Sequence, residues 1–236
     1  MQSLKKAFYQ IIKSIAGLIL AFNVLSFLWV LLYGYIPIPV TKLMVIEGET
    51  KEVDYQWVDL ENISGKVQLA VMCAEDQYFI LHDGLDFKSI EEAIESNKRG
   101  GRVKGASTIT QQVAKNVFLW PDRDWARKGA ELYYALLIDA VWSKERIMEV
   151  YLNIAEMGDG VFGVEAASKK YFKKSASDLT TQQAALIAAI LPSPKRYSAT
   201  NPGPYVQGRV SWITRQMGYW GNKMTYEKAF VEEMVK

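Results

Sequence analysis

Two adjacent acidic residues, Glu75 and Asp76, have the side-chain chemistry and the place in the sequence that suit a general base. The two carboxylates follow the apolar run 67–74, so they lie where a buried helix would reach the wall of a cleft. Partial desolvation there raises the basicity of a carboxylate and suits it to remove a proton from a substrate hydroxyl. A solvated helix end would have the same sequence, so the pair alone leaves both interpretations open.

The segment 105–116 combines polar side chains that suit a phosphate or sugar ligand. Thr108, Gln112 and Lys115 are spaced i, i+4 and i+7, so a hydroxyl, an amide and an ammonium share one helix face. The apolar residues occupy the other face: Ile109, Val113 and Val117. An ordinary amphipathic surface helix would show the same spacing.

A third cluster consists of Arg127, Lys128 and Glu131. Arg127 and Glu131 are four residues apart and can form an ion pair on one helix face. The segment 98–105 is basic and glycine-rich, which predicts either a gate over an anionic ligand or a solvated loop. His82 is the only histidine, and we expect it to be structural.

Helix signals dominate the chain after residue 60 and predict a compact, mostly α-helical domain that positions these clusters. No alternation of apolar and polar residues extends beyond a few positions. Residues 41–60 are interpreted as an extended linker or small strands. Side chains that can cap helix N-termini precede the apolar periodic segments: Asp86 or Ser89, Thr108 with Gln111, Asp124, Ser143, and Thr180 with Gln183. We expect the first of these helices to end at Gly100-Gly101 and the last to end before Pro192.

An uncharged apolar run extends from Ile15 to Tyr33. A helix of this length spans about 28 Å, close to the hydrocarbon core of a bilayer. Three lysines precede the run and the next charge is Lys42, which predicts an N-terminus in the cytoplasm and an extracytoplasmic remainder. A cleavable signal peptide is the competing interpretation, but no A-x-A-like site follows. We therefore expect residues 1–40 to form a short tail and a single-pass anchor in the cytoplasmic (inner) membrane, and 41–236 to form the periplasmic-side domain.

Composition and charge narrow the class of protein. Hydrophobic residues make up 50% of the chain, which permits a sizeable core. The net charge of +2 is too small to indicate a nucleic-acid partner. Cys73 is the only cysteine and lies in an apolar string, so no intrachain disulfide can form and a packing role is expected.

In their order along the chain, four motifs closely resemble those of the glycosyltransferase family 51 domain, the peptidoglycan glycosyltransferases. The matching segments are Glu75–Gly84 (Glu-Asp-x-x-Phe-x-x-His-x-Gly), Gly105–Asn116 (Gly-x-Ser-Thr-Ile-Thr-Gln-Gln-x-x-Lys-Asn), Arg127–Glu131 (Arg-Lys-x-x-Glu) and Lys144–Asn153 (Lys-x-x-Ile-x-Glu-x-Tyr-Leu-Asn). The resemblance covers roughly residues 65–220 and leaves no room for a transpeptidase domain. It implies the monofunctional biosynthetic form and a lysozyme-like helical fold.

The resemblance also implies a reaction and roles for individual residues. Members of the family polymerise lipid II by inverting transfer from an undecaprenyl-diphosphate donor to the 4-hydroxyl of an acceptor sugar. Glu75 and Glu131 are then the catalytic carboxylates, with Glu75 as the base. The residues expected to bind or shape the substrate site are Asp76, Thr108, Gln112, Lys115, Asn116, Arg127 and Lys128. Of these, Lys115, Arg127 and Lys128 are expected on the diphosphate, because a diphosphate leaving group needs charge neutralisation.

Glu131 has two alternative roles that the sequence does not separate. It either holds a divalent metal, Mg or Mn, near the diphosphate, or it orients Arg127. The expected partners are lipid II, the growing lipid-linked glycan and the cytoplasmic membrane, with other cell-division or cell-wall synthesis proteins as further candidates. Apolar residues between 85 and 105 are a candidate surface for contact with lipid.

Two other functions compete with glycan synthesis. A lysozyme-like peptidoglycan hydrolase could use Glu75 as an acid, but the cationic clusters favour a diphosphate donor. An inactive membrane scaffold of the cell-wall machinery would tolerate loss of site residues, yet every catalytic-type position is filled.

Overall fold

The computed structural model describes residues 2–98, 100, 107–122, 124–221, 224–228 and 231. By their contacts they fall into two compact units, residues 1–36 and 37–236. The α-helices are α1 (Gln2–Tyr33), α2 (Lys42–Gly48), α3 (Gly65–Glu75), α4 (Phe87–Lys98), α5 (Ile109–Phe118), α6 (Trp125–Val141), α7 (Lys144–Ile154), α8 (Val164–Phe172), α9 (Thr181–Ile190) and α10 (Pro204–Tyr219). The short elements are the strands β1 (Asp54–Tyr55), β2 (Glu156–Gly158) and β3 (Val161–Phe162) and the 3₁₀ turns η1 (Leu60–Asn62) and η2 (Ala176–Asp178). The predicted mostly α-helical fold is confirmed.

The first unit consists mainly of α1, a helix long and apolar enough between Leu4 and Tyr33 to cross a membrane. Its polar interruption Asn23 donates its side-chain amide to the carbonyl oxygen of Ile19 at 2.8 Å. A polar side chain that bonds within its own helix is compatible with a hydrocarbon environment, where unpaired polar groups are costly. This unit fits a single-pass membrane anchor.

The helix N-termini of the second unit form where the capping residues predict them. In α5, the Thr108 hydroxyl accepts from the Gln111 backbone N–H at 3.1 Å, and the Gln111 side chain accepts from the Thr108 N–H at 2.9 Å. The same reciprocal capping starts α9, and single side-chain caps start α6 and α7. At α4 the capping residue is Asp86, which accepts from the Ser89 N–H at 2.9 Å.

The end of α4 also matches the sequence in part. The helix ends at Lys98, and Gly100 has a φ of +73°, a left-handed conformation that glycine adopts at low cost. Gly101 and most of the proposed basic gate 98–105 lie outside the described residues. Phe87 and Ile94 of α4 are exposed, so the candidate lipid-contact surface stays a prediction.

The prediction of an extended segment over residues 41–60 is wrong for its first part. Residues 42–48 form α2, because Thr41 caps this helix: its hydroxyl accepts from the Met44 N–H at 3.3 Å. The Met44 sulfur in turn accepts from the Thr41 N–H at 3.4 Å. Strand β1 follows with only two residues, and η1 completes the segment.

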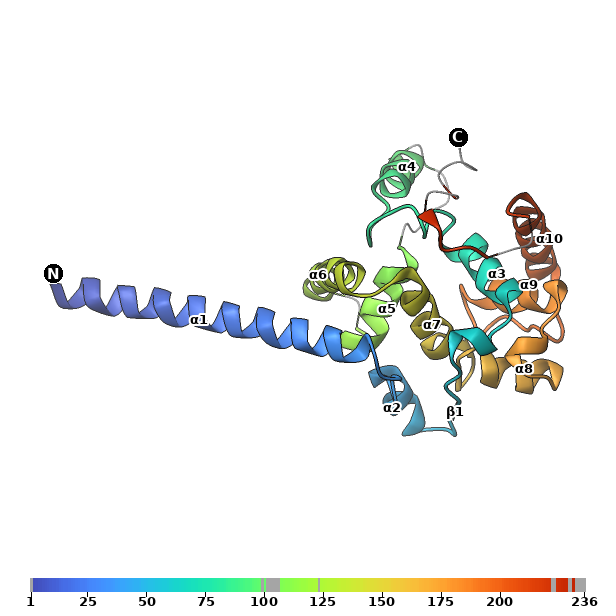
Figure 1. Cartoon of the computed structure of the whole chain (residues 1–236), viewed down its shortest axis with the longest axis horizontal. Coiled ribbons are helices and arrows are strands. Elements are labelled where there is room, and N and C mark those ends of the chain that lie inside the picture. Colours follow the sequence, from blue (N-terminus) through green and yellow to red (C-terminus); the bar gives the residue numbers. More distant parts are fainter. Residues whose placement is uncertain are drawn as a thin grey trace. The chain divides into compact units, whose positions relative to one another are not determined.

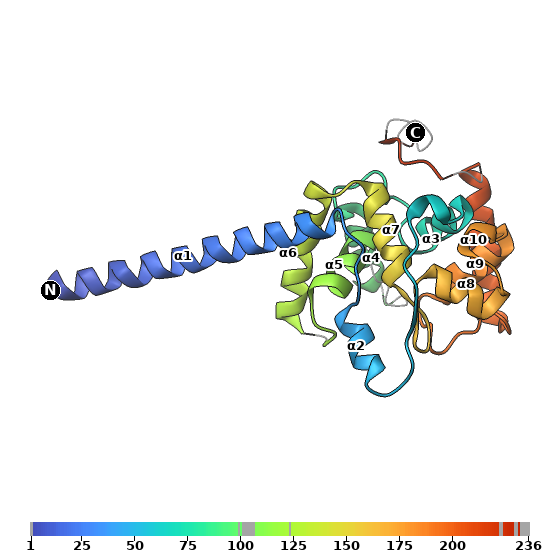
Figure 2. The same cartoon turned by 60° about the horizontal axis from the view of Figure 1, so that its bottom comes forward.

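The helices of the second unit gather on two sides of α7, as both views show (Figures 1 and 2). Helices α5 and α6 lie on one side, and α3, α8, α9 and α10 lie on the other. Helix α9 packs against both α3 and α10, and its many small alanine side chains permit a close approach.

A three-stranded sheet in the order β1-β3-β2 joins the segment after α2 to the turn after α7. Strand β1 falls within the segment 41–60, for which small strands were one of two predictions, whereas β2 and β3 are too short to give an alternating pattern and were not predicted. Asn153 of α7 supports this junction: its side chain accepts from the Val58 N–H and donates to the Val58 carbonyl oxygen, both at 2.8 Å. Gly163 follows with a φ of +81°, and a Cβ there would lie 2.4 Å from the carbonyl oxygen of Asn153. The close approach of the two segments therefore requires glycine.

Candidate active site

Glu75 is the last residue of α3, a helix whose preceding side chains are largely buried. The Glu75 carboxylate therefore lies at the end of a helix that is anchored in the core, and this residue is half-buried. Its Oε2 accepts a hydrogen bond of 3.0 Å from Nε2 of Gln112 on α5. The predicted base and a predicted substrate-binding residue are therefore in direct contact.

Asp76 is buried and bonds to the protein rather than to solvent. Its carboxylate accepts from the Ile109 backbone N–H at 2.9 Å and forms a hydrogen bond of 2.9 Å with Nε2 of His82. These bonds fix the end of α3 against the start of α5 and give His82 the structural place expected from the sequence. Asp76 shapes the site by holding its neighbour Glu75 in position.

Thr108 is also buried and committed to the fold. Besides capping α5, its hydroxyl donates to the carbonyl oxygen of Gly84 at 2.7 Å. The sequence placed Thr108 on the same open face as Gln112 and Lys115. The structure gives it a buried cap position instead, since an N-cap side chain folds back on its own helix.

Two cavities of about 460 and 400 Å³ adjoin Glu75 and Gln112. The walls of both include Ser107. The smaller cavity is lined by Glu75, Asp76 and Thr108 and by Trp212 of α10. The larger cavity is lined by the remaining predicted site residues, from α5 and α6: Gln112, Lys115, Asn116, Arg127, Lys128 and Glu131. The hydrogen bond from Gln112 to Glu75 therefore joins a residue of the larger cavity to one of the smaller.

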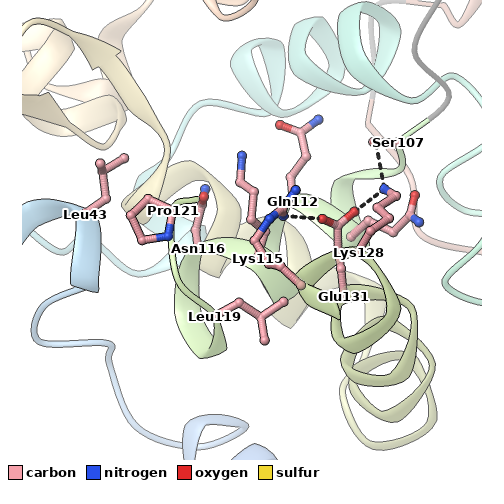
Figure 3. A pocket seen from close by; sticks show the side chains of 11 residues that line it. Leu43, Ser107, Gln112, Lys115, Asn116, Leu119, Pro121, Lys128 and Glu131 are labelled. Carbon is pink, nitrogen blue, oxygen red and sulfur yellow. Dashed lines mark hydrogen bonds and ion pairs between the residues drawn. The ribbon is translucent and has the colours of Figure 1, made fainter. Parts of the chain in front are cut away.

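The wall of the larger cavity carries an excess of positive charge. Glu131 is buried, and its carboxylate accepts from Nη1 of Arg127 at 2.7 Å and forms an ion pair with Lys128 (Figure 3). Lys128 also donates to the Ser107 hydroxyl at 3.5 Å. Lys115 lines the same cavity, so three cations and one carboxylate contribute to its wall. Such a cavity suits an anionic ligand, because Arg and Lys can contact several phosphate oxygens.

The geometry of Glu131 bears on its two predicted roles. Both of its carboxylate oxygens already contact cations, and an ion pair with Arg127 at i, i+4 is present. Among the described residues, the one group of three His, Cys, Asp or Glu side chains with converging ligand atoms is Glu47, Glu156 and Asp159. The described side chains around Glu131 therefore do not fit a preformed metal site, and they support the orienting role.

Burial raises the pKa of Glu75 above its ordinary value. The hydrogen bond from Gln112 and the positive charges of Arg209 and Lys115 act in the opposite direction but do not cancel the effect of burial. Proximity to the Asp76 carboxylate adds to the increase. The environment thus makes Glu75 a stronger base than an exposed glutamate.

Sequence reasoning missed Ser107 and Arg209 as site residues. Ser107 lies within a motif already recognised, so its place between the cavities could have been found from that segment. Arg209 of α10 lies outside the four motifs, donates to the Ala74 carbonyl oxygen at 3.1 Å and stacks over the Trp212 ring. No local pattern separates it from Arg215, the other basic residue of that helix.

A family model described as Transglycosylase matches residues 42–218, which is most of the chain. The chain belongs to the transglycosylase family. This membership confirms the resemblance drawn from the four motifs, and with it a helical, lysozyme-like enzyme domain.

Relatives within the transglycosylase family are similar along nearly their whole length. A protein of Bdellovibrio bacteriovorus named biosynthetic peptidoglycan transglycosylase is 53% identical over 212 residues, covering 87% of this chain and 85% of the relative. A protein of the same name from Pseudomonas putida is 47% identical over 218 residues, covering 89% and 92%. The Haemophilus influenzae protein of that name is 47% identical over 206 residues, covering 84% of each.

The raised pKa of Glu75 predicts a pH-dependent effect of Glu75→Gln on stability. A carboxyl whose pKa is higher in the folded than in the unfolded state destabilises the fold above the folded pKa, and this cost vanishes below the unfolded pKa. Glu75→Gln should therefore raise the melting temperature relative to the parent at about pH 8 and lose that advantage near pH 4, close to the unfolded pKa. Thermal unfolding followed by circular dichroism measures the melting temperatures of the parent and the variant at each pH.

The matched control is Glu145→Gln, which changes an exposed carboxylate on α7. It should shift the melting temperature little at either pH. An equal effect of Glu75→Gln at both pH values would contradict the raised pKa.

Proposed function

We propose that this enzyme polymerises lipid II into peptidoglycan glycan strands, with the acceptor sugar at the Glu75 cavity and the donor diphosphate at the cationic cavity. One observation carries the proposal: the two cavities are neighbours, and the hydrogen bond from Gln112 to Glu75 joins a residue of one to a residue of the other. A base and a phosphate-binding wall on neighbouring cavities suit displacement at the carbon between them. The relatives' shared name, biosynthetic peptidoglycan transglycosylase, supports the same reaction.

The transfer proceeds by direct displacement at the donor anomeric carbon. The acceptor 4-hydroxyl forms the new carbon–oxygen bond, and its proton passes to Glu75 as the bond forms. The bond from the anomeric carbon to the diphosphate oxygen breaks, and the electron pair leaves with the diphosphate. Attack from the side opposite the leaving group inverts the configuration. A diphosphate departs without a proton, so the site needs one carboxylate base and cations rather than two carboxyl groups.

The cations neutralise the charge that develops on the leaving group. Arg127 can present two N–H groups to phosphate oxygens, and Glu131 holds its guanidinium in place. Lys115 and Lys128 add point charges on the same wall. Asn116 lines this cavity and is available to bind the substrate. A bound Mg²⁺ or Mn²⁺ stays a prediction. The described side chains around Glu131 do not fit a preformed metal site, and the proposed reaction uses the cationic side chains to neutralise the diphosphate.

The anchor places the enzyme with its substrates. Lipid II and the growing glycan carry polyprenyl tails, so a membrane-bound enzyme searches for them in two dimensions and at raised effective concentration. We propose an N-terminus in the cytoplasm, on the basis of the three lysines that precede the apolar run of α1, and a catalytic domain of residues 41–236 on the extracytoplasmic side of the inner membrane. We further propose that other cell-division or cell-wall synthesis proteins are partners at this location.

Glu75→Gln should abolish polymerisation by the detergent-solubilised full-length protein. Removal of a positioned general base typically costs about 10²- to 10⁴-fold in rate. The measurement is glycan formed from labelled lipid-linked disaccharide-peptide, with Glu145→Gln as the control that should retain parental activity. Equal polymer from Glu75→Gln would remove Glu75 as the base. Fragments released from finished wall, without polymer, would favour the hydrolase, and a folded, substrate-binding parent without activity would favour the scaffold.

Arg127→Lys should lower kcat/KM for lipid II although it keeps the charge. Lysine lacks the two-pronged donor geometry, and loss of one transition-state donor of this kind costs roughly 10- to 100-fold or more. The control is Arg215→Lys, an exposed residue of α10, which should behave like the parent. An unchanged kcat/KM for Arg127→Lys would contradict the proposed contact with the diphosphate.

A reporter enzyme that folds only outside the cytoplasm tests the proposed orientation. Fused after Lys236 it should be active, and fused ahead of the first residue it should be inactive, because the lysines that precede the apolar run retain that end in the cytoplasm. The reverse pattern would contradict the orientation and leave the reaction untouched.

A further inference from the structure

Tyr151 of α7 extends the contact between Glu75 and Gln112 by one more residue. Its hydroxyl donates to Oε1 of Gln112 at 3.3 Å, while Nε2 of the same amide donates to Glu75 at 3.0 Å. Tyr151 is almost fully buried, with 1% of its surface exposed. The three residues come from three different helices, α3, α5 and α7, and form a continuous hydrogen-bonded chain.

The direction of this chain matters because a carboxamide has two opposite ends. The NH₂ group stabilises an ionised carboxylate, whereas the carbonyl oxygen repels it. Rotation of the Gln112 amide by half a turn would exchange these ends at Glu75. A donor on the far side of the amide favours the orientation that turns NH₂ toward Glu75.

Tyr151 is chemically suited to be that donor. Burial raises the pKa of its hydroxyl well above the ordinary value, and the negative charges of Glu75 and Asp76 act in the same direction. The hydroxyl therefore stays protonated at any working pH. A buried tyrosine hydroxyl also requires a hydrogen-bond partner, and the Gln112 carbonyl oxygen supplies one.

We propose that Tyr151 is a positioning residue for glycosyl transfer, which holds the Gln112 amide with its NH₂ toward Glu75 and so sets the basicity of that carboxylate. The part of the inference that concerns transfer rests on the proposed function. The other charged groups that act on Glu75 are Asp76 beside it, Lys115 on α5 and Arg209 on α10. Those groups act on Glu75 directly, whereas Tyr151 acts through Gln112.

Tyr151→Phe removes the donor and keeps the ring. The Gln112 amide then loses its fixed orientation, and the ionised form of Glu75 loses part of a stabilising hydrogen bond. Loss of such a bond raises the carboxyl pKa, so we expect the Glu75 titration midpoint to move upward by about half a unit to one unit. Activity on the acid side should accordingly be lost at a higher pH than in the parent.

The first readout is the infrared titration of Glu75 in the full-length protein with ¹³C-labelled glutamate, taken as the difference from Glu75→Gln. It reports the pKa whether or not the protein makes glycan. The second readout is the pH dependence of kcat for polymerisation, whose acid limb should move by the same amount while KM changes little. A parent that makes no polymer would defeat the proposed function, and the infrared midpoint would still decide the role of Tyr151.

Two further variants separate positioning from packing. Tyr171→Phe removes a hydroxyl that donates to the Met157 carbonyl oxygen at 2.8 Å, so it should lower stability slightly without moving either titration. Gln112→Met should itself raise the Glu75 pKa, and adding Tyr151→Phe to it should produce no further shift. If Tyr151→Phe does not fold, an unchanged Glu75 midpoint in Gln112→Met would overturn the proposal, because Tyr151 acts on Glu75 only through that amide.

An unchanged midpoint in Tyr151→Phe would overturn the proposal. A shift of the same size in Tyr171→Phe would also overturn it, and so would additive shifts in the double variant.

Discussion

The site depends on the cost of removing water from one carboxylate. Glu75 lies at the end of a helix whose other side chains form part of the core, so its basicity is set by where α3 stops. Burial raises its pKa, and a single amide donor together with nearby cations acts in the opposite direction. A glutamate in open solvent would be a weaker base, and an unassisted buried one would hold its proton. A carboxyl pKa between these two limits suits a general base.

Much of the surrounding structure maintains this balance. Asp76 ties the end of α3 to α5, and Thr108 caps α5 while bonding to Gly84. Both residues belong to the motifs, yet their polar atoms bind the protein. The cationic wall is organised in the same way, since buried Glu131 pairs with Arg127 and Lys128. A buried carboxylate between two cations keeps the Arg127 guanidinium in one orientation. The guanidinium of a flexible surface arginine would have no such fixed orientation.

The sequence predicted the helices and the gathering of site residues well, because those features have local causes. Capping residues start helices through bonds within a few positions, and the spacing in 108–115 determines which side chains share a face. The failures have non-local causes. The strands pair over two or three residues, the role of Arg209 depends on how α10 packs near α3, and the Thr108 side chain is buried by contact with Gly84. Spacing alone could not distinguish a side chain that caps a helix from one that faces a ligand.

The central claim is that a carboxylate with a raised pKa on one cavity removes the acceptor proton while cations on the adjoining cavity receive the diphosphate. The most direct measurement is the pH dependence of kcat/KM for polymerisation of lipid-linked disaccharide by the parent protein. We predict an acid limb whose apparent pKa lies above that of an exposed glutamate, about 4.3. A rate that persists undiminished below that pH would contradict the account.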